Sequence, residues 1–408
     1  MARFQSGSKS EEETPTVRSW VLTPGQVTHL LGKLESHLPY SIPLLRRIQF
    51  HLRQPISPTA RIFVAAVVDS EDEEQDLASG DDGRRELPQS WLLETQSRNQ
   101  PWIAAYIDLG FPGQTAVWVY GSWESDLDSP FPSSLPNSMD ALALTHAEPH
   151  PTYKALMNGL FNYISAELIP LISTSPTEEW LNLERTGKYL SKPYSRDKVL
   201  FGTLSEKLWG LLPREARTRT DNGYLKHIFR VESGAQNGDE REDGSVPAPS
   251  LPQGYSFGVM KDENLQTVLD RTPIPRTLNT LRQSVSVGLF HESSSTPIGW
   301  GFLGKDASLS SLHTEPEHRG KGLAVALGAE LLRKQHIVTS SANMQETRGR
   351  EGSEVNGQSK EEGGYTWAHA DVNESNTASL RVMEKLGGKP TWVVMWAEVD
   401  MKEVFAVQ

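Results

Sequence analysis

Hydrophobic residues alternate with polar ones in several short runs of the chain and recur every three to four residues in others. Strand-type runs span 61–68, 102–109, 116–123, 199–204, 298–302, 307–315, 365–372 and 392–399. Helical spacing covers 153–172, 205–212, 323–334 and 376–386. Strands and helices mixed in this order predict an α+β fold, with mixed central sheets flanked by helices.

Three internal stretches interrupt these patterns: 70–85, 234–252 and 340–364 are rich in Gly, Ser, Glu and Asp and nearly free of large apolar residues. Chains of this composition cannot bury enough apolar surface to fold. The sequence therefore predicts a disordered tail over 1–17, an N-terminal domain over 18–230 with an acidic insertion at 70–85, and a disordered linker over 231–252. A C-terminal domain with a disordered insertion at 340–364 is expected over 253–408.

Composition narrows the chemistry. The 408 residues carry a net charge of −12, but the acidic excess lies in the tail and the polar stretches, so it says little about what the folded part binds. The absence of cysteine excludes disulfides, thiolate metal sites and a cysteine nucleophile. No apolar run approaches the ~20 residues of a membrane helix, and we expect a soluble cytoplasmic protein, with a nuclear location also possible, that binds neither membrane nor nucleic acid.

The strand over 307–315 has irregular spacing. Its large apolar residues, Leu309 and Leu312, are three positions apart, so a regular strand would place them on opposite faces. Either one of them is exposed, or an extra residue between them forms a β-bulge.

A short loop with two glycines and a lysine, Gly320-Lys321-Gly322, precedes the helix that starts at Leu323. Unpaired amides at a helix start suit a phosphate group. A Walker loop does not fit, because Lys321 is followed by glycine and the required earlier glycine is missing. A dinucleotide fingerprint does not fit either, because Val325 stands where Gly or Ala is needed.

A third pattern fits. Arg319 to Ala324 (RGKGLA) matches [Q/R]-x-x-G-x-[G/A], and it resembles the acyl-CoA site of the GNAT superfamily of N-acetyltransferases. Downstream, ADVNESNTASLRVMEKLG (370–387) resembles that superfamily's second signature, with Asn376 and Ser379 opening a helix that closes with K-L-G. The resemblance covers about 254–400 and is nearest to the glycine N-acyltransferase-like branch, which implies two GNAT-like domains with a degenerate N-terminal one.

The resemblance implies a cofactor site. The amides of Gly320, Lys321, Gly322, Leu323 and Ala324 would hold the pyrophosphate of acetyl-CoA, with charge added by Arg319 and Lys321. The backbone of Leu312, His313 and Thr314 would pair with the pantetheine arm, and Asn376 and Ser379 would face the cofactor. Two histidines, His313 and His318, form no ligand set for a metal, and no metal is expected.

Because the chain has no cysteine to act as a nucleophile, the simplest mechanism is direct attack of a small-molecule or peptide amine on the thioester in a ternary complex. Many GNATs place a tyrosine acid seven residues after the helix asparagine, whereas this chain has Met383. Asp306 and His313 are the candidate catalytic bases. Gly388, where the family commonly has phenylalanine, predicts an acceptor pocket that is wider or differently packed.

Two further base candidates, His369 and Asp371, lie on the next strand. Two functions stand: an acyl-CoA-dependent N-acetyltransferase, or a catalytically weak or inactive protein that keeps the CoA-binding fold. Bare glycine amides at the helix start favour the first, since a fold without cofactor does not need them. The acceptor, the acyl-chain preference and the oligomeric state remain open at this point.

Overall fold

The computed structural model describes residues 16–54, 57–68, 87, 91, 100–125, 149–188, 190–220, 223–232, 246–335 and 365–406. The predicted insertions at 70–85 and 340–364 lie outside these residues, as does most of the predicted tail. The part of the predicted linker at 233–245 also lies outside, so the domain division near it stays a prediction.

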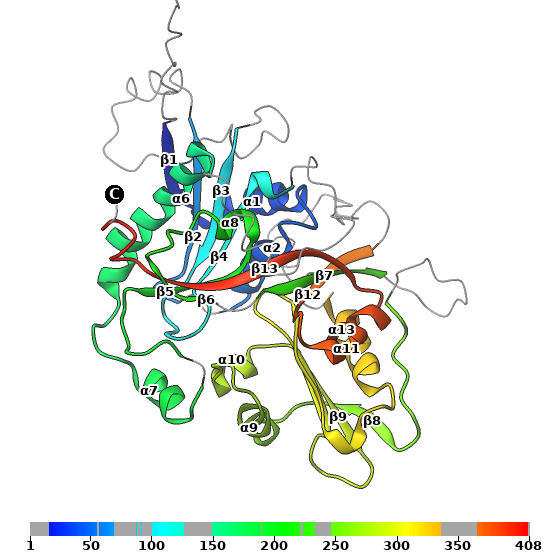
Figure 1. The fold of residues 1–408 in the computed structure, drawn as a ribbon. Helices are drawn as coiled ribbons and strands as arrows, with labels where there is room; N and C mark the ends of the chain where they lie inside the picture. The colour runs from blue at the N-terminus through cyan, green and yellow to red at the C-terminus, as the bar shows by residue number, and fades with distance from the viewer. Residues whose placement is uncertain are drawn as a thin grey trace, which may run out of the picture.

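The larger of two sheets has nine strands (Figure 1). Its strand order is β1-β2-β3-β4-β5-β13-β7-β12, with β6 beside β13, and all pairs are antiparallel except β4 with β5. The strands are β1 (Val17–Val21), β2 (Arg61–Val67), β3 (Trp102–Ile107), β4 (Val117–Gly121), β5 (Lys198–Ser205), β6 (Arg217–Thr220), β7 (Tyr224–Glu232), β12 (Tyr365–Asn373) and β13 (Lys389–Asp400).

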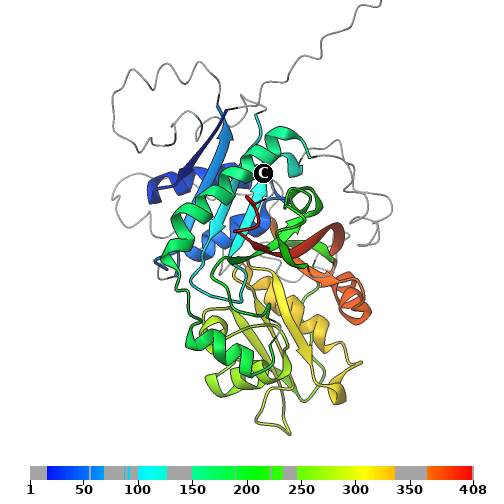
Figure 2. The same ribbon diagram turned by 60° about the vertical axis from the view of Figure 1, so that its left-hand side comes forward.

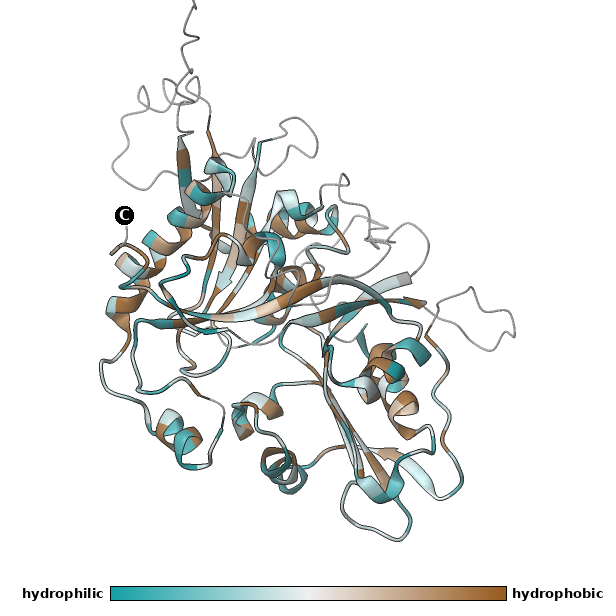
Figure 3. Ribbon diagram, in the orientation of Figure 1, coloured by the Kyte–Doolittle hydropathy of each residue, from teal (hydrophilic) through white to brown (hydrophobic). Residues whose placement is uncertain are grey.

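Helices cover both faces of the β1–β5 part of this sheet (Figures 1 and 2). On one face, Leu156 and Leu160 of α6 (Pro151–Tyr163) pack on Phe63 and Ile103. On the other face, α1 (Pro24–Glu35) and α2 (Ile42–His51) pack on alternate residues of the same strands, such as Val64. Because both faces are covered, the strands are apolar at nearly every position, which gives the brown sheet of Figure 3.

Shorter elements complete the N-terminal half. They are η1 (Ser122–Ser125), η2 (Ile164–Leu168), η3 (Ile169–Leu171), α7 (Glu178–Arg185) and α8 (Glu206–Trp209).

The second sheet has four antiparallel strands in the order β11-β10-β9-β8. The strands are β8 (Tyr255–Gly258), β9 (Ser286–His291), β10 (Gly299–Leu303) and β11 (Leu309–Thr314), and the short helix η4 (Pro316–His318) follows β11. Residues of α9 (Asp262–Arg271) and α10 (Leu278–Arg282) pack on Trp300 and Phe302 of one face. On the other face α11 (Leu323–Arg333) shares a core with β12 and α13 (Thr377–Lys385).

Strand β13 joins the two halves of the chain. It runs between β5, from the first half, and β7, so a strand from residues 389–400 lies in the middle of the large sheet (Figure 1). Sequence separation of the strands therefore does not match their order in space.

The predicted elements are found close to their expected positions, and the α+β prediction is confirmed. The helix predicted over 205–212 is shorter, since α8 ends at Trp209. Sequence patterns missed β1, α1, α2, α7, β6, β7, β8, α9, α10 and β9.

Of the two alternatives for the irregular spacing in β11, the structure shows the bulge. Trp300 pairs with His313 and Phe302 pairs with Ser310, so two steps on β10 face three steps on β11. The extra residue lies between Ser310 and His313. Ser311, in this stretch, has a φ of 52°, which lies in the left-handed region. A β-bulge with a strained residue bends the strand and re-aims its neighbours.

Candidate functional site

The loop between η4 and α11 is open at both of its glycines. Gly320 has φ 80° and Gly322 has φ 78°, and an added Cβ at either position would meet no atom within 4 Å. Gly322 is the N-cap of α11 and gives its first turn no side-chain cap. The helix therefore starts with bare backbone exposed to its surroundings.

The amides of 320–324 lack recorded partners in the part of the chain that the structure describes. The first backbone bonds after Arg319 are those of Val325 and Ala326 to the carbonyl of Gly322. Unsatisfied amides at a helix N-terminus, together with the helix dipole, form a site suited to an anion such as a phosphate.

Two side chains shape this loop. Arg319 is exposed and its Nε donates to the carbonyl oxygen of Thr314 at 2.9 Å, which ties the loop to the end of β11. The Lys321 Nζ donates to the Tyr255 hydroxyl at 2.8 Å, and that hydroxyl lies 3.0 Å from His318 Nδ1. The two predicted cations therefore lie at the loop. Arg319 also makes a hydrogen bond to the backbone, which its motif did not indicate.

In the part of the chain that the structure describes, no strand pairs with the edge of β11 away from β10. β11 ends the four-stranded sheet and β12 ends the nine-stranded one, so the two neighbours are not hydrogen-bonded to each other as strands. They stay linked near the start of β11, where His369 Nε2 of β12 donates to the carbonyl oxygen of Asp306 at 2.8 Å. An edge beside the bulge is thus free to accept an extended chain, as an added strand would.

Helix α13 contributes less than its motif implies. The Asn376 side chain caps the helix by accepting from the Ser379 amide at 3.1 Å. Met383 is buried at 3% exposure inside the core between α11, α13 and β12. A Cβ on Gly388 would lie 2.5 Å from the Phe229 ring, so the ring from β7 fills that space and the region is differently packed rather than wider.

His313 lies on the face of β11 that α9 and α10 cover. Its ring stacks on Trp300, with centroids 4.3 Å apart and planes at 15°. Its Nε2 lies 3.6 Å from the Glu315 carboxylate, which in turn accepts from Arg271 Nε at 3.2 Å. Burial alone would raise the pKa of Glu315, but Arg271 and His313 outweigh burial and lower it.

Asp306 is a poorer candidate base. It is 7% exposed, and its carboxylate accepts from the Ser308 hydroxyl at 2.6 Å, the Ser308 amide at 3.2 Å and Trp118 Nε1 at 3.4 Å. Burial opposes ionisation, but His369, the Ser308 bonds and Lys226 outweigh it, and the pKa of Asp306 is lowered. A carboxylate of lowered pKa that already accepts three hydrogen bonds is a weak proton acceptor.

His369 and Asp371 belong to a buried network. Lys226 Nζ lies 2.7 Å from Asp371 Oδ1 and 3.3 Å from His369 Nδ1. Since His369 Nε2 donates to a carbonyl, its Nδ1 accepts from the lysine, which fixes a neutral tautomer. Burial, reinforced by Lys226, lowers the pKa of His369.

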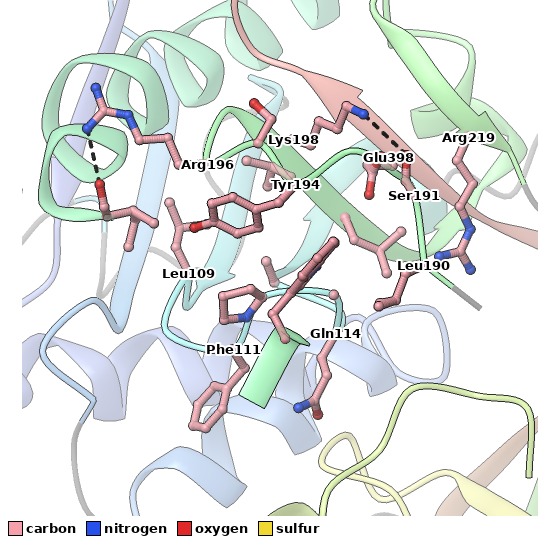
Figure 4. A pocket seen from close by; sticks show the side chains of 18 residues that line it. Leu109, Phe111, Gln114, Leu190, Ser191, Tyr194, Arg196, Lys198, Arg219 and Glu398 are labelled. Atoms are coloured by element: carbon pink, nitrogen blue, oxygen red, sulfur yellow. Dashed lines mark hydrogen bonds between the residues drawn. The ribbon is translucent and has the colours of Figure 1, made fainter. Parts of the chain in front are cut away.

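A pocket lies elsewhere, beside β4 and β5 (Figure 4). Leu109, Phe111 and Tyr194 are among its lining residues, with Arg196 on one side and Arg219 and Glu398 on another. Its lining takes no residue from β11 or from the loop before α11. The pocket is therefore separate from the open helix start.

Glu315 and Arg271 were missed by sequence reasoning. The signal was present, because Glu315 stands two residues after His313 and therefore shares its face of the strand. Arg271, 44 positions away, could not be placed from the pattern.

Comparison with family models decides the relationship. Residues 16–227 match the model described as the acyl-CoA N-acyltransferase verG N-terminal domain. This match covers more than half of the chain. The chain belongs to this acyl-CoA N-acyltransferase family. The sequence-based assignment is thereby confirmed at the level of acyl-CoA N-acyltransferases, and it came from the half of this acyltransferase that the model does not match.

Solved structures with a similar chain course include a protein from Drosophila, at 13% identity, with 94% of this chain and 98% of that one covered and a TM-score of 0.49. A tandem GNAT protein of the clavulanic acid biosynthesis pathway aligns at 12% identity over 95% and 99% of the two chains, with a TM-score of 0.38. A GCN5-related N-acetyltransferase from Sphaerobacter thermophilus aligns at 12% over 94% and 96%, with a TM-score of 0.37. A search of curated proteins found no match to this acyltransferase.

Among the described residues of this acyltransferase, no helix is long and apolar enough to cross a bilayer. The same residues contain no group of three or more His, Asp or Glu side chains placed to hold a metal ion.

Proposed function

We propose that this N-acyltransferase transfers an acetyl group from acetyl-CoA to an amine by direct attack in a ternary complex. The observation that carries the proposal is the helix start at 320–324, where partnerless amides and two open left-handed glycines face outward beside the free edge of β11. These residues fit a pyrophosphate, which needs bare backbone at close approach.

In this proposal the backbone of Leu312, His313 and Thr314 pairs with the pantetheine arm, and the amide at the bulge stabilises the oxyanion of the tetrahedral intermediate. The carbonyl of Thr314 already accepts from Arg319, so the pairing relies on the other backbone groups of this segment. Preorganised amides of this kind contribute several kcal/mol of barrier lowering in acyl transfer, about 3–4 kcal/mol for one donor.

His313 acts as the general base. The neutral amine adds to the thioester carbonyl, which forms the C–N bond and the tetrahedral oxyanion, and its proton passes to the imidazole. The intermediate then collapses as the C–S bond breaks, and CoA leaves as a thiolate that solvent protonates. Glu315 supports the charge that the imidazole gains. Met383 supplies no acid, because it lies in the core and has no ionisable proton.

The test is release of free CoA thiol from acetyl-CoA in the presence of an amine panel, measured from pH 6 to 9. His313→Gln should lower kcat by ~100-fold or more and remove the acidic limb of the pH profile. Asp306→Asn should change the rate little while lowering stability, because its hydrogen bonds are structural. A full rate with an unchanged acidic limb in His313→Gln contradicts the base assignment. CoA binding without turnover on any amine would favour the alternative, an inactive CoA-binding protein.

A further inference from the structure

The C-terminal end of α9 is closed by a side chain from the first half of the chain. Lys188, which follows α7, donates from its Nζ to the carbonyl oxygen of Thr272 at 2.7 Å and also to that of Leu269. An ammonium group in this place satisfies the last carbonyls of a helix and interacts favourably with the helix dipole. The contact therefore joins the two halves of the chain at one helix end.

The backbone cannot close this helix end, for a reason that the sequence shows. The C-cap of α9, Thr272, is followed by Pro273 and then by Pro275, and proline has no amide hydrogen to donate. The amide between the two prolines, that of Ile274, donates to the Thr272 hydroxyl at 3.2 Å. Among the described residues, no backbone amide beyond the helix bonds to its last carbonyls. Lys188 therefore supplies donors that the local sequence lacks.

The capped turn carries Arg271, the residue that reaches toward the proposed base. Arg271 lies between the two capped carbonyls in the sequence, and its Nε donates to the Glu315 carboxylate at 3.2 Å. That carboxylate lies 3.6 Å from His313 Nε2. The Arg271 side chain is 58% exposed, so its ion pair alone is a weak restraint. The cap by Lys188 fixes the backbone from which this side chain extends.

Packing connects α9 to the same histidine by a second path. Leu265 of α9 shares a hydrophobic cluster with Trp300, and the His313 ring stacks on Trp300 at a centroid distance of 4.3 Å. Because protein cores are close-packed, a shift of α9 moves the surface against which the His313 ring lies. The neighbouring helix α10 is also held from the first half, since Gln114 Oε1 accepts from the Thr280 hydroxyl at 3.1 Å.

We infer that Lys188 is a positioning residue for the catalytic base: by capping α9 it holds Arg271 and thereby the carboxylate beside His313. The inference rests on the proposed function, in which His313 is the base. It gives the first half of this acyltransferase a part in the reaction, because the lysine belongs to that half and the base belongs to the other.

The first variant removes the cap. Lys188→Met deletes the ammonium group and keeps an unbranched side chain. With acetyl-CoA and the best acceptor of the amine panel, kcat for thiol release should fall by ~10-fold, because small displacements of catalytic groups are costly. KM for acetyl-CoA should stay within about twofold, since the side-chain contacts of the glycine loop come from β8 and β11. Lys188→Arg should restore kcat to within about threefold, because a guanidinium also donates to carbonyl oxygens.

Lys192→Met is the matched control. Lys192 lies four residues after Lys188, and its Nζ pairs with Glu184 of α7 at 3.4 Å, within the first half. Its side chain is 54% exposed, so this change should leave kcat within about twofold of wild type.

A second variant tests the order of the contacts. Arg271→Gln keeps the cap and removes the bond to Glu315, so kcat should fall by a similar factor. Because both changes break the same chain of contacts, the variant that carries Lys188→Met and Arg271→Gln together should fall no further than the slower single variant.

An unchanged kcat in Lys188→Met, no rescue by Lys188→Arg, or additive losses in the double variant each overturn the inference and leave the proposed function intact. If no amine accepts the acetyl group, the proposed function fails separately, and NMR tests the positioning without turnover. The ring signals of His313, assigned by their loss in His313→Gln, should shift in Lys188→Met and stay in place in Lys192→Met. Signals that do not shift in Lys188→Met overturn the inference.

Discussion

Two polar regions of this acyltransferase are built in opposite ways. At the start of α11, the backbone amides of 320–324 have no partner among the described residues, and the glycines have open space beside them. At the junction between β7, β12 and the β10–β11 turn, Lys226, His369, Asp371 and Asp306 are buried, and each is held by its neighbours. The hydrogen-bonding groups of the first region are available to a ligand, whereas those of the second region are already paired within the fold.

This difference in burial and hydrogen bonding distinguishes candidate bases that look alike in the sequence. The sequence named Asp306 and His313 as the candidate bases and His369 and Asp371 as further ones, because histidine and aspartate can all accept protons. Only His313 keeps partial exposure, at 27% for its side chain, together with a carboxylate at 3.6 Å. Burial and prior hydrogen bonding remove the others from consideration as proton acceptors.

The largest effect is expected in the buried network. Lys226→Met leaves Asp371 buried without its cation, so the free energy of unfolding should fall by about 3–5 kcal/mol. Urea denaturation measures it. Lys402→Met is the control, because Lys402 pairs with Asp197 at 2.6 Å but is 70% exposed. Similar losses in the two variants would show that burial does not distinguish the pairs.

Gly322→Val tests the open region. A side chain there would stand where the pyrophosphate approaches, and CoA affinity measured by calorimetry should fall by ~100-fold. Gly187→Val is matched to it, since Gly187 also has a positive φ, of 67°, and open space around its Cβ. Both variants carry the same backbone strain, of about 1–2 kcal/mol. Unchanged CoA affinity in a folded Gly322→Val protein would contradict the site assignment.

A smaller effect depends on pH. The lowered pKa of His369 means that the unfolded chain binds the proton first as pH falls below about 6.5, so stability is lost on the acidic side. Glutamine at 369 can donate to Asp306 and accept from Lys226 without titrating. His369→Gln should be less stable than wild type at pH 8, and the gap should narrow toward pH 5 in urea unfolding. His29→Gln, at an exposed position, is the matched control variant.

The smallest effect concerns the bulge. Ser311 has φ 52° and a buried hydroxyl without a partner among the described residues, so Ser311→Gly should leave stability unchanged or raise it by up to ~1 kcal/mol. Ser310→Gly, on regular strand backbone, should lower it by about 0.5–1 kcal/mol. Thermal unfolding of the two variants measures the difference. Losses of equal size would show that the bulge stores no strain.

Local pattern predicted much of the fold. Short apolar or alternating runs located β2, β3, β4, β5, β10 and β12, and the Leu309–Leu312 spacing indicated a bulge as one of two alternatives, because each pattern depends on neighbouring residues alone. Helix α2 was missed because nearly every residue, including Arg46 and Arg47, is buried, so no polar face marks it.

Sequence could not predict the contacts between distant segments. Phe229 fills the space beside Gly388 from another strand, and Trp118 bonds Asp306 across 188 positions. Such pairs depend on how β7, β12 and β13 join the large sheet. The glycine loop at 320–322 was readable because glycine, helix start and cation are adjacent in the chain, whereas the pair of Glu315 and Arg271 joins residues 44 positions apart.

The central position of β13 determines when the large sheet can be completed during synthesis. During synthesis β5 and β7 leave the ribosome well before residues 389–400, so neither strand can gain its central neighbour until that segment has emerged. Until then two apolar strand edges stay unpaired, the kind of surface that invites aggregation. The first half therefore depends on β13 to complete its own sheet, and nascent chains of this acyltransferase should need protection by chaperones until β13 has been synthesised.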